Sequence, residues 1–303
     1  LAGGPSLGAA EHCFCAPLDE AFAEVRLICV PESGAGSAEM ALAPYGAYPK
    51  GGRQFIGSFR TTLTEDFFGG LAAAWGCRMI ARKVRGSNAH HVVESTFKSF
   101  ARCLRRAMDA AAGYEVEALS EAAAAETSPS ARRRVGAKAR ATKETSIDVA
   151  VHLDPQPSEK WGLISTGVAT LDELLREIEA TSRLRLKVRC SGDTWIDEHH
   201  SAEDVTITIG QALNVALGDK GGCTRMGYAE AACEDARVRC VMDLSNRPCL
   251  CSDLPFEECD AEMVGDLSVE MICHCFDSLT TSSQMTAHLE FLPSAAGRSA
   301  PPA

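Results

Sequence analysis

An internal repeat constrains the fold of this chain more than any other feature of its sequence. The stretch IGSFRTTLTEDFFGGL, Ile56–Leu71, aligns without gaps with VGDLSVEMICHCFDSL, Val264–Leu279, at an offset of 208 residues. A second pair, CAPLDEA ending at Ala21 and AACEDA ending at Ala236, repeats at an offset of 215 residues. One repeat unit therefore spans about 210 residues, and a chain of 303 residues holds one and a half units and begins within one of them.

Strand-like and helical patterns are mixed along the chain. Apolar residues recur at three- and four-residue spacing in three segments, which predicts helices over 89–108, 169–178 and 202–216. Three aliphatic runs predict strands over 25–30, 184–190 and 237–244. Long helices mixed with strands predict layers of sheet and helix, an α+β architecture.

Composition and charge exclude several classes of protein. The hydrophobic content of 46% is enough for a sizeable core, which argues against disorder for most of the chain. A net charge of -11 gives no positive field for a phosphodiester backbone, so we expect no nucleic-acid partner. No apolar run approaches the roughly 20 residues that span a bilayer, so we expect a soluble protein with no membrane partner. The start at Leu1, with no targeting pattern, is typical of a fragment or an excised product.

Fourteen cysteines is a high number for a chain of this length. Several occur in pairs with one residue between them, a spacing too tight for the usual zinc-ribbon pairs: Cys13/Cys15, Cys249/Cys251 and Cys273/Cys275. We expect the cysteines to be mostly reduced and buried. A secreted disulfide framework is the alternative, and it is disfavoured because such frameworks serve short chains that lack a core.

The pattern His-His-x-x-Glu occurs twice and supplies candidate metal ligands: His90, His91, Glu94, His199, His200 and Glu203. On a helix the first His and the Glu share one stripe, whereas the second His points roughly 100° around and can serve a different ligand sphere. A solvated helix face explains one such motif well, but two copies use four of the eight histidines. Imidazole and carboxylate without thiolate favour Mn²⁺, with Zn²⁺ or Fe²⁺ as competitors.

These motifs and their surroundings resemble imidazoleglycerol-phosphate dehydratase, a dimanganese lyase family of histidine biosynthesis. The segments that carry the resemblance are RATKETSIDV (140–149), ISTGVATLDELL (164–175), SGDTWIDEHHSAEDVTITIGQALNVALGDKGG (191–222), MDLSNRP (242–248), EMICHCFDSL (270–279) and GSNAHHVVESTFKSFARCLRRAM (86–108). The resemblance covers most of the chain, but its two halves occur in permuted order.

The resemblance and the composition together predict five segments. Residues 1–113 resemble a C-terminal half with HHVVE, and the Ala/Glu-rich and basic stretch 114–131 is a linker. Residues 132–225 resemble an N-terminal half with HHSAE, and 226–292 resemble a truncated second C-terminal half. We expect the tail 293–303 to be disordered, because it offers nothing to pack.

The resemblance implies an α+β fold of repeated sheet-plus-helix half-domains. It also implies a large homo-oligomer with active sites between subunits and two Mn²⁺ ions per site. Carried over residue by residue, the metal ligands are His90, His91, Glu94, His199, His200, Glu203, His274 and Glu173. Glu173 stands where the family has His, and a carboxylate can still bind Mn²⁺. In the first copy Asp66 stands at the position of His274.

The implied reaction dehydrates imidazole glycerol phosphate, a small phosphate substrate, to imidazole acetol phosphate. Glu144 in TKET is the candidate acid–base residue because it lies off the metal motifs, and a surface Glu beside Lys143 is the alternative interpretation. The candidate substrate contacts are Arg225, Arg247, Lys98, Ser130 and Arg132. A dianionic phosphate needs several fixed donors of this kind.

Two hypotheses about activity stay open at this point. The first is an active dehydratase in which half-units assemble a composite site. The second is a catalytically impaired structural segment of a tandem polyprotein, which the replacements at Glu173 and at Thr181, where the family has a second His, support. A third possibility is that the 1–303 boundaries are an artefact of gene-model slicing, in which case the function belongs to the neighbouring sequence. We expect a cytoplasmic protein, with a plastid as the alternative compartment.

Overall fold

The computed structural model describes residues 10–29, 36–46, 52–114, 134–155, 162–234 and 236–292. The chain forms two compact units, the first from residues 1–127 and 226–243 and the second from 128–225 and 244–303. The predicted linker, from residue 115 on, and the predicted tail lie outside the described residues. Each unit is described by itself.

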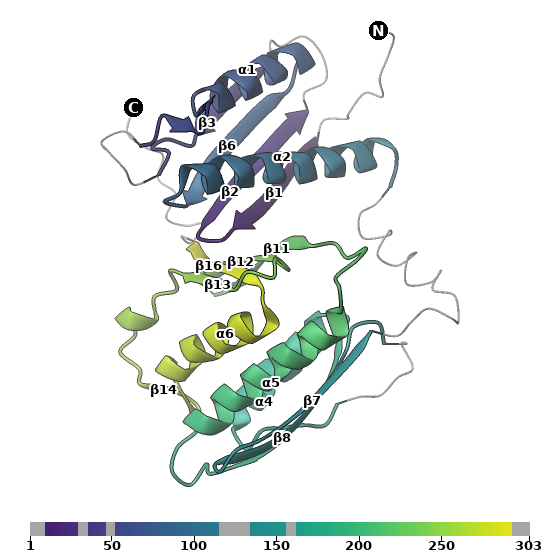
Figure 1. The fold of residues 1–303 in the computed structure, drawn as a ribbon, viewed down its shortest axis with the longest axis vertical. Coiled ribbons are helices and arrows are strands. Elements are labelled where there is room, and N and C mark those ends of the chain that lie inside the picture. The colour runs from purple at the N-terminus through teal and green to yellow at the C-terminus, as the bar shows by residue number, and fades with distance from the viewer. Residues whose placement is uncertain are drawn as a thin grey trace. The chain divides into compact units, whose positions relative to one another are not determined.

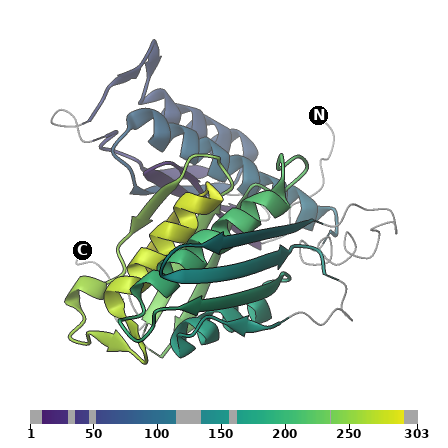
Figure 2. The same ribbon diagram turned by 60° about the horizontal axis from the view of Figure 1, so that its bottom comes forward.

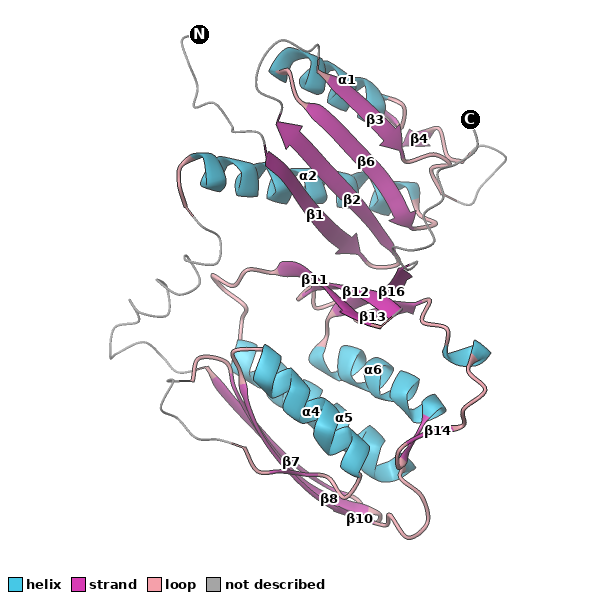
Figure 3. Ribbon diagram, turned by 180° about the vertical axis from the view of Figure 1, so that it is seen from behind, coloured by secondary structure: helices cyan, strands magenta, loops and turns pink. Residues whose placement is uncertain are grey.

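The first unit is a four-stranded sheet with two helices on one face (Figures 1 and 3). In spatial order its strands are β1 (Ala10–Leu18), β2 (Ala21–Cys29), β6 (Arg78–Arg85) and β3 (Ser37–Ala41). The strands β1, β2 and β6 pair antiparallel, and β3 runs parallel to β6. The helices are α1 (Leu63–Trp75) and α2 (Ala89–Ala111). Phe14, Val25, Phe68 and Val92 are fully buried between the sheet and the helices.

A hairpin from later in the chain completes the first unit. It consists of β11 (Met226–Cys233) and β12 (Ala236–Asp243), which pair antiparallel. Val241 and Tyr228 of the hairpin pack with Cys15 and Phe22 of β1 and β2. The Tyr228 hydroxyl donates to the Cys13 carbonyl at 3.3 Å. The hairpin therefore covers apolar surface of the β1–β2 pair.

The second unit repeats the same architecture (Figure 2). Its sheet has the spatial order β7 (Val135–Ala141), β8 (Thr145–His152), β10 (Arg185–Gly192) and β9 (Ile164–Ser165). The helices are α4 (Ala169–Thr181), α5 (His199–Leu217) and α6 (Val269–Ser283). A parallel pair, β13 (Cys249–Ser252) and β16 (Thr286–Leu292), and the short helix η1 (Phe256–Glu258) complete the unit. Helix α5 lies between the sheet and α6 (Figure 3).

The structure reproduces the sequence repeat element by element. A two-stranded ribbon of β4 (Phe55–Ile56) and β5 (Phe59–Arg60) precedes α1. The equivalent ribbon of β14 (Met263–Val264) and β15 (Leu267–Ser268) precedes α6, with each strand 208 residues further along. The predicted α+β class with repeated sheet-plus-helix half-domains is therefore confirmed.

The predicted helices and strands match the structure, with small shifts at their ends. The helix expected over 202–216 begins three residues earlier, at His199, directly after an Asx-type turn in which the Asp197 carboxylate accepts the His199 backbone N–H at 3.0 Å. The strand expected over 25–30 begins earlier, at Ala21, after a tight turn with Asp19 at φ 49°. None of the described helices combines the length and the apolar character that a membrane span requires.

All fourteen cysteines lie in the described part of the chain, and none forms a disulfide. The expectation that they are mostly buried is wrong. Only four are buried: Cys15, Cys29, Cys77 and Cys103. Cys233, Cys259 and Cys273 are exposed, and the other seven are half-buried. The error has a physical cause, because many of these residues lie on strands or helix faces that this chain leaves partly uncovered.

Within the first unit, a buried ion-pair network joins the hairpin β11–β12 to strand β2. Arg239 and Glu24 are each 4% exposed, and Arg239 Nη1 lies 2.8 Å from Glu24 Oε2. Arg26 Nε donates to the other Glu24 oxygen at 2.9 Å, and Arg82 lies 3.7 Å away. Burial alone raises the pKa of Glu24, but the Arg26 hydrogen bond and the charges of Arg239 and Arg82 outweigh it and lower the pKa.

Removing the Glu24 charge takes from the buried Arg239 guanidinium one of its two carboxylate partners, the other being Glu230 at 2.7 Å. We therefore expect Glu24→Gln to destabilise the first unit by about 3 kcal/mol. Urea unfolding measures the change in the free energy of unfolding, and hydrogen exchange of the β1 and β2 amides assigns that change to the first unit. The matched control is Glu39→Gln, which removes an exposed ion pair with Arg78 and should cost less than about 1 kcal/mol. Equal effects of the two substitutions would contradict the stabilising role of the buried Glu24 carboxylate.

The same network predicts a pH dependence. A carboxyl whose folded pKa is depressed contributes stability above its unfolded pKa, here 4.5, and that stability is lost as the pH falls through the folded pKa. The parent should therefore lose stability below about pH 4.5, and Glu24→Gln should show a smaller loss over that range. Parallel acid-unfolding profiles for the two proteins would contradict this.

Candidate metal centre

Three potential ligands meet on helices α5 and α6 of the second unit. One ligand atom each of His199, Glu203 and His274 lies within 4.8 Å of the others. His274 Nε2 is 3.0 Å from Glu203 Oε1, and His199 Nε2 is 3.7 Å from Glu203 Oε2. The His199 and His274 rings are 5.6 Å apart and tilted by 34°. Two imidazoles and one carboxylate are a donor set that can hold a divalent ion.

The close packing of α5 against α6 brings His274 to this position (Figure 3). Gly210 of α5 makes this contact possible. A Cβ at residue 210 would lie 2.1 Å from Ser282 Oγ and 2.9 Å from the Leu279 carbonyl oxygen. Since real Cβ atoms do not approach backbone so closely, any larger residue would separate the two helices.

His200, the second histidine of the same motif, points to a different group. Its Nδ1 lies 3.1 Å from Asp193 Oδ2, and the Asp193 residue is 5% exposed. The hydrogen bond with Asp193 raises the pKa of His200, and the charge of Glu144 acts in the same direction. Glu144 is exposed in the turn between β7 and β8, so the predicted acid–base residue acts electrostatically on this motif.

In the first unit the motif lies in the first turn and a half of α2. His90 Nε2 is 2.9 Å from Glu94 Oε2, and Lys98 Nζ is 3.0 Å from Glu94 Oε1. Burial alone raises the pKa of Glu94, but the hydrogen bonds from Lys98 and His90 outweigh it and lower the pKa. Among the described residues, no third His, Cys, Asp or Glu ligand atom joins His90 and Glu94 within 4.8 Å.

His91 is held by the turn between β1 and β2. Its Nδ1 is 2.6 Å from Glu20 Oε2, and its Nε2 is 3.8 Å from Asp19 Oδ2. The other Glu20 oxygen accepts the backbone N–H groups of Ser87 at 3.2 Å and Asn88 at 2.8 Å. Glu20 therefore fixes both the start of α2 and the orientation of its second histidine.

The other predicted site residues are not gathered with these ligands. Glu173 is exposed on α4 and belongs to no cluster of three ligand atoms, and Asp66 is exposed in the first turn of α1. Lys98 lies in the first unit, whereas Arg225 and Arg247 are exposed in the second. Ser130 and Arg132 lie outside the described residues.

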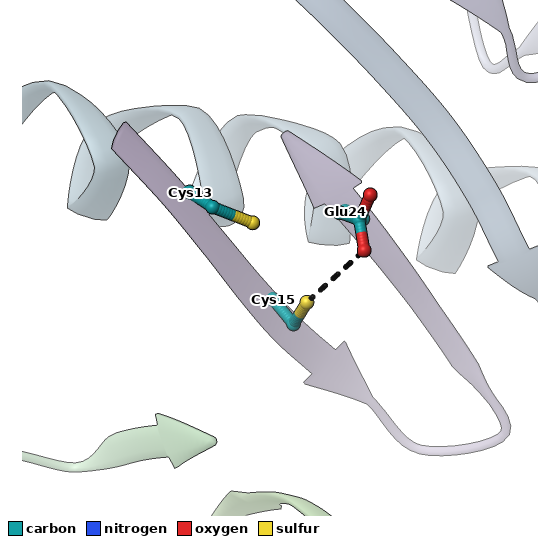
Figure 4. Close-up of side chains that lie close together, drawn as sticks. All are labelled: Cys13, Cys15 and Glu24. Atoms are coloured by element: carbon teal, nitrogen blue, oxygen red, sulfur yellow. Dashed lines mark hydrogen bonds between the residues drawn. The ribbon is translucent and has the colours of Figure 1, made fainter. Parts of the chain in front are cut away.

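A second group of potential ligands in the first unit consists of Cys13, Cys15 and Glu24 (Figure 4). The Cys15 thiol lies 3.9 Å from Glu24 Oε2. The hydrogen bond with Cys13 and burial raise the pKa of Cys15, which opposes the thiolate that metals require. The arginines around Glu24 also repel a cation. This group is the polar part of an ion-pair network and offers a poor metal site.

Glu20 and Asp193 were not identified from the sequence. Asp193 follows Gly192, the last residue of β10, and opens a turn in which its carbonyl accepts the Ile196 N–H at 2.8 Å; its side chain is also buried at the helix start. Glu20 lies 71 residues before His91, so no local spacing connects them. The available signal was indirect: an acidic residue at a strand end, which is where a sheet presents side chains to the following helix.

Comparison with known proteins gives a consistent family. A sequence model described as "Imidazoleglycerol-phosphate dehydratase" matches residues 9–104 and 166–297. A protein of that name from Phaffia rhodozyma is 38% identical over 159 residues, covering 52% of this chain and 76% of the relative. One from Cereibacter sphaeroides is 40% identical over 153 residues, covering 50% of this chain and 75% of the relative. The crystal structure of the Staphylococcus aureus dehydratase aligns with a TM-score of 0.45 and 27% identity, over 53% of this chain and 85% of that chain.

The three-ligand cluster predicts which substitution matters most for metal binding. Replacing His274 with Ala removes one of three donors, so we expect Mn²⁺ affinity at this site to fall more than about 100-fold, beyond the loss typical of an outer-shell contact. The Mn²⁺ affinity is measured by a titration monitored by electron paramagnetic resonance. The control is Cys273→Ser, an exposed neighbour on the same helix. An affinity for His274→Ala within about twofold of that control would contradict the assignment.

Proposed function

Because this chain belongs to the imidazoleglycerol-phosphate dehydratase family, we propose that it is a metal-dependent hydro-lyase that converts imidazole glycerol phosphate to imidazole acetol phosphate in histidine biosynthesis. The relatives carry that name, and the family is one of hydro-lyases. The observation that carries the metal dependence is the meeting of His199, Glu203 and His274 within 4.8 Å.

The donor set in the second unit fits Mn²⁺. His199 and His274 offer imidazole nitrogens, Glu203 offers a carboxylate oxygen, and no thiolate shares the cluster. This combination suits borderline and hard divalent ions. When bound, the ion supplies a positive charge that stabilises the negative charge developing on the substrate. Two Mn²⁺ ions per site need further ligands, and the proposed ones are His90, His91, Glu94 and His200. Glu173 is the weakest candidate ligand because it is exposed and lies apart from the three-ligand cluster.

Dehydration removes a proton from carbon and a hydroxyl group, which leave together as water. Glu144 is the proposed residue for the proton transfer. It is exposed to solvent, which leaves its carboxylate accessible, and its charge is felt at His200. A carboxylate positioned beside a metal ligand, without being one, can accept and return a proton.

Cationic side chains are proposed to bind the phosphate. Arg225 and Arg247 are exposed in the second unit, and a guanidinium matches the geometry of phosphate oxygens. Lys98 is the third candidate, and its ion pair with Glu94 holds it close to the metal motif of the first unit. Ser130 and Arg132 complete the proposed contacts from the sequence alone.

Assembly and location are also proposed here. The family resemblance favours a homo-oligomer, with a small phosphate compound as the substrate. The cytoplasm is the proposed compartment, with a plastid as the alternative. The competing function is a catalytically impaired structural segment, which the exposed Glu173 and the two-ligand motif of the first unit favour.

Metal content and turnover distinguish the two functions. After Mn²⁺ loading, we expect the purified chain to retain manganese by mass spectrometry and to dehydrate imidazole glycerol phosphate. A chelator should abolish turnover, and added Mn²⁺ should restore it. Retained metal with no turnover would overturn the catalytic proposal and leave the structural segment. No retained metal would overturn the metal dependence itself.

Glu144 has its own test. We expect Glu144→Gln to lower kcat by about 10²- to 10⁴-fold while Mn²⁺ affinity stays within about twofold, because an acid–base group contributes to rate and not to metal ligation. Steady-state kinetics and a Mn²⁺ titration measure the two quantities. Lys143→Gln is the matched control in the same turn. A fall in kcat no larger than that of the control would contradict the role.

A further inference from the structure

We propose that Glu20 and Asp193 are positioning residues that hold the second histidine of each HHxxE motif with its Nε2 directed to a metal ion. This inference rests on the proposed function, because it concerns the metal that the function requires. Neither residue belongs to an HHxxE motif, and each contacts its histidine through Nδ1.

The hydrogen-bond chemistry fixes which nitrogen carries the proton. An ionised carboxylate can only accept a hydrogen bond, so His91 Nδ1 must donate to Glu20 and His200 Nδ1 must donate to Asp193. A neutral imidazole that is protonated on Nδ1 presents an unprotonated Nε2, which is the atom that can bind a metal. Carboxylates that orient metal-binding histidines in this way are a common outer-shell arrangement.

The two contacts have the same chemistry but different origins in the sequence. Asp193 follows β10 directly and lies seven residues before His200. In the first unit the residue that follows the equivalent glycine, Gly86, is Ser87, which has no carboxylate. Instead, Glu20 reaches the start of α2 from the β1–β2 turn and accepts the Ser87 N–H at 3.2 Å. Two different elements thus supply one contact, which common descent of the repeats does not explain.

The geometry of each contact argues against an incidental surface ion pair. Asp193 is 5% exposed, and a buried carboxylate needs a partner. Glu20 binds two backbone N–H groups through one oxygen and His91 through the other, so its carboxylate has a fixed orientation. In contrast, the first histidine of each motif directs Nε2 to its own motif Glu, as expected when both groups are ligands.

The test reads the histidine tautomers directly. In the metal-free chain, at a pH where imidazole is neutral, ¹⁵N correlation spectra should show His91 and His200 protonated on Nδ1. Asp193→Asn and Glu20→Gln should each shift the tautomer of their own histidine only, because an amide can also donate to Nδ1. Asp193→Glu and Glu20→Asp keep a carboxylate and should restore the parent tautomer. Glu177→Gln, an exposed change on α4, is the control.

Metal affinity is the second readout. We expect Asp193→Asn and Glu20→Gln to weaken Mn²⁺ binding by about 10- to 100-fold, with Glu177→Gln within about twofold of the parent. Unchanged tautomers in both amide variants, or unchanged affinity, would overturn the positioning role. If the parent shows the Nδ1 tautomers, controlled by the carboxylates, but binds no Mn²⁺, the proposed function fails and the positioning of the imidazoles stands.

Discussion

The close approach of α5 and α6 is the constraint on which the candidate metal centre depends. His199 and Glu203 come from α5 and His274 from α6, so the three donors meet only while the two helices stay in contact. Gly210 permits that contact, because the Ser282 hydroxyl and the Leu279 carbonyl occupy the space of a side chain. A packing detail about two helical turns from Glu203 and about three from His199 therefore determines whether the ligands form a site.

Helix periodicity explains what the sequence could predict about the site. A four-residue separation places His199 and Glu203 on one stripe of a helix, and the same holds for His90 and Glu94. The repeat predicted the α+β class and the correspondence between α1 and α6, which lie 208 residues apart in the aligned segments. These features depend on local spacing, which a sequence displays directly.

Contacts across the fold could not be predicted in the same way. Glu20 reaches His91 because the turn between β1 and β2 lies beside the start of α2, although the two residues are 71 positions apart in the sequence. Asp193 opens a turn, as residues of its type often do, but the local sequence does not show that its carboxylate is buried and contacts His200. The exposure of many cysteines had no sequence signal, because it depends on which strand and helix faces are covered.

We propose above all that the second unit holds a metal ion between α5 and α6. The most direct measurement is anomalous diffraction at the manganese edge from crystals grown with Mn²⁺. We expect an anomalous peak within coordinating distance of the ligand atoms of His199, Glu203 and His274. Crystals that contain Mn²⁺ but show no peak at these three residues would contradict it.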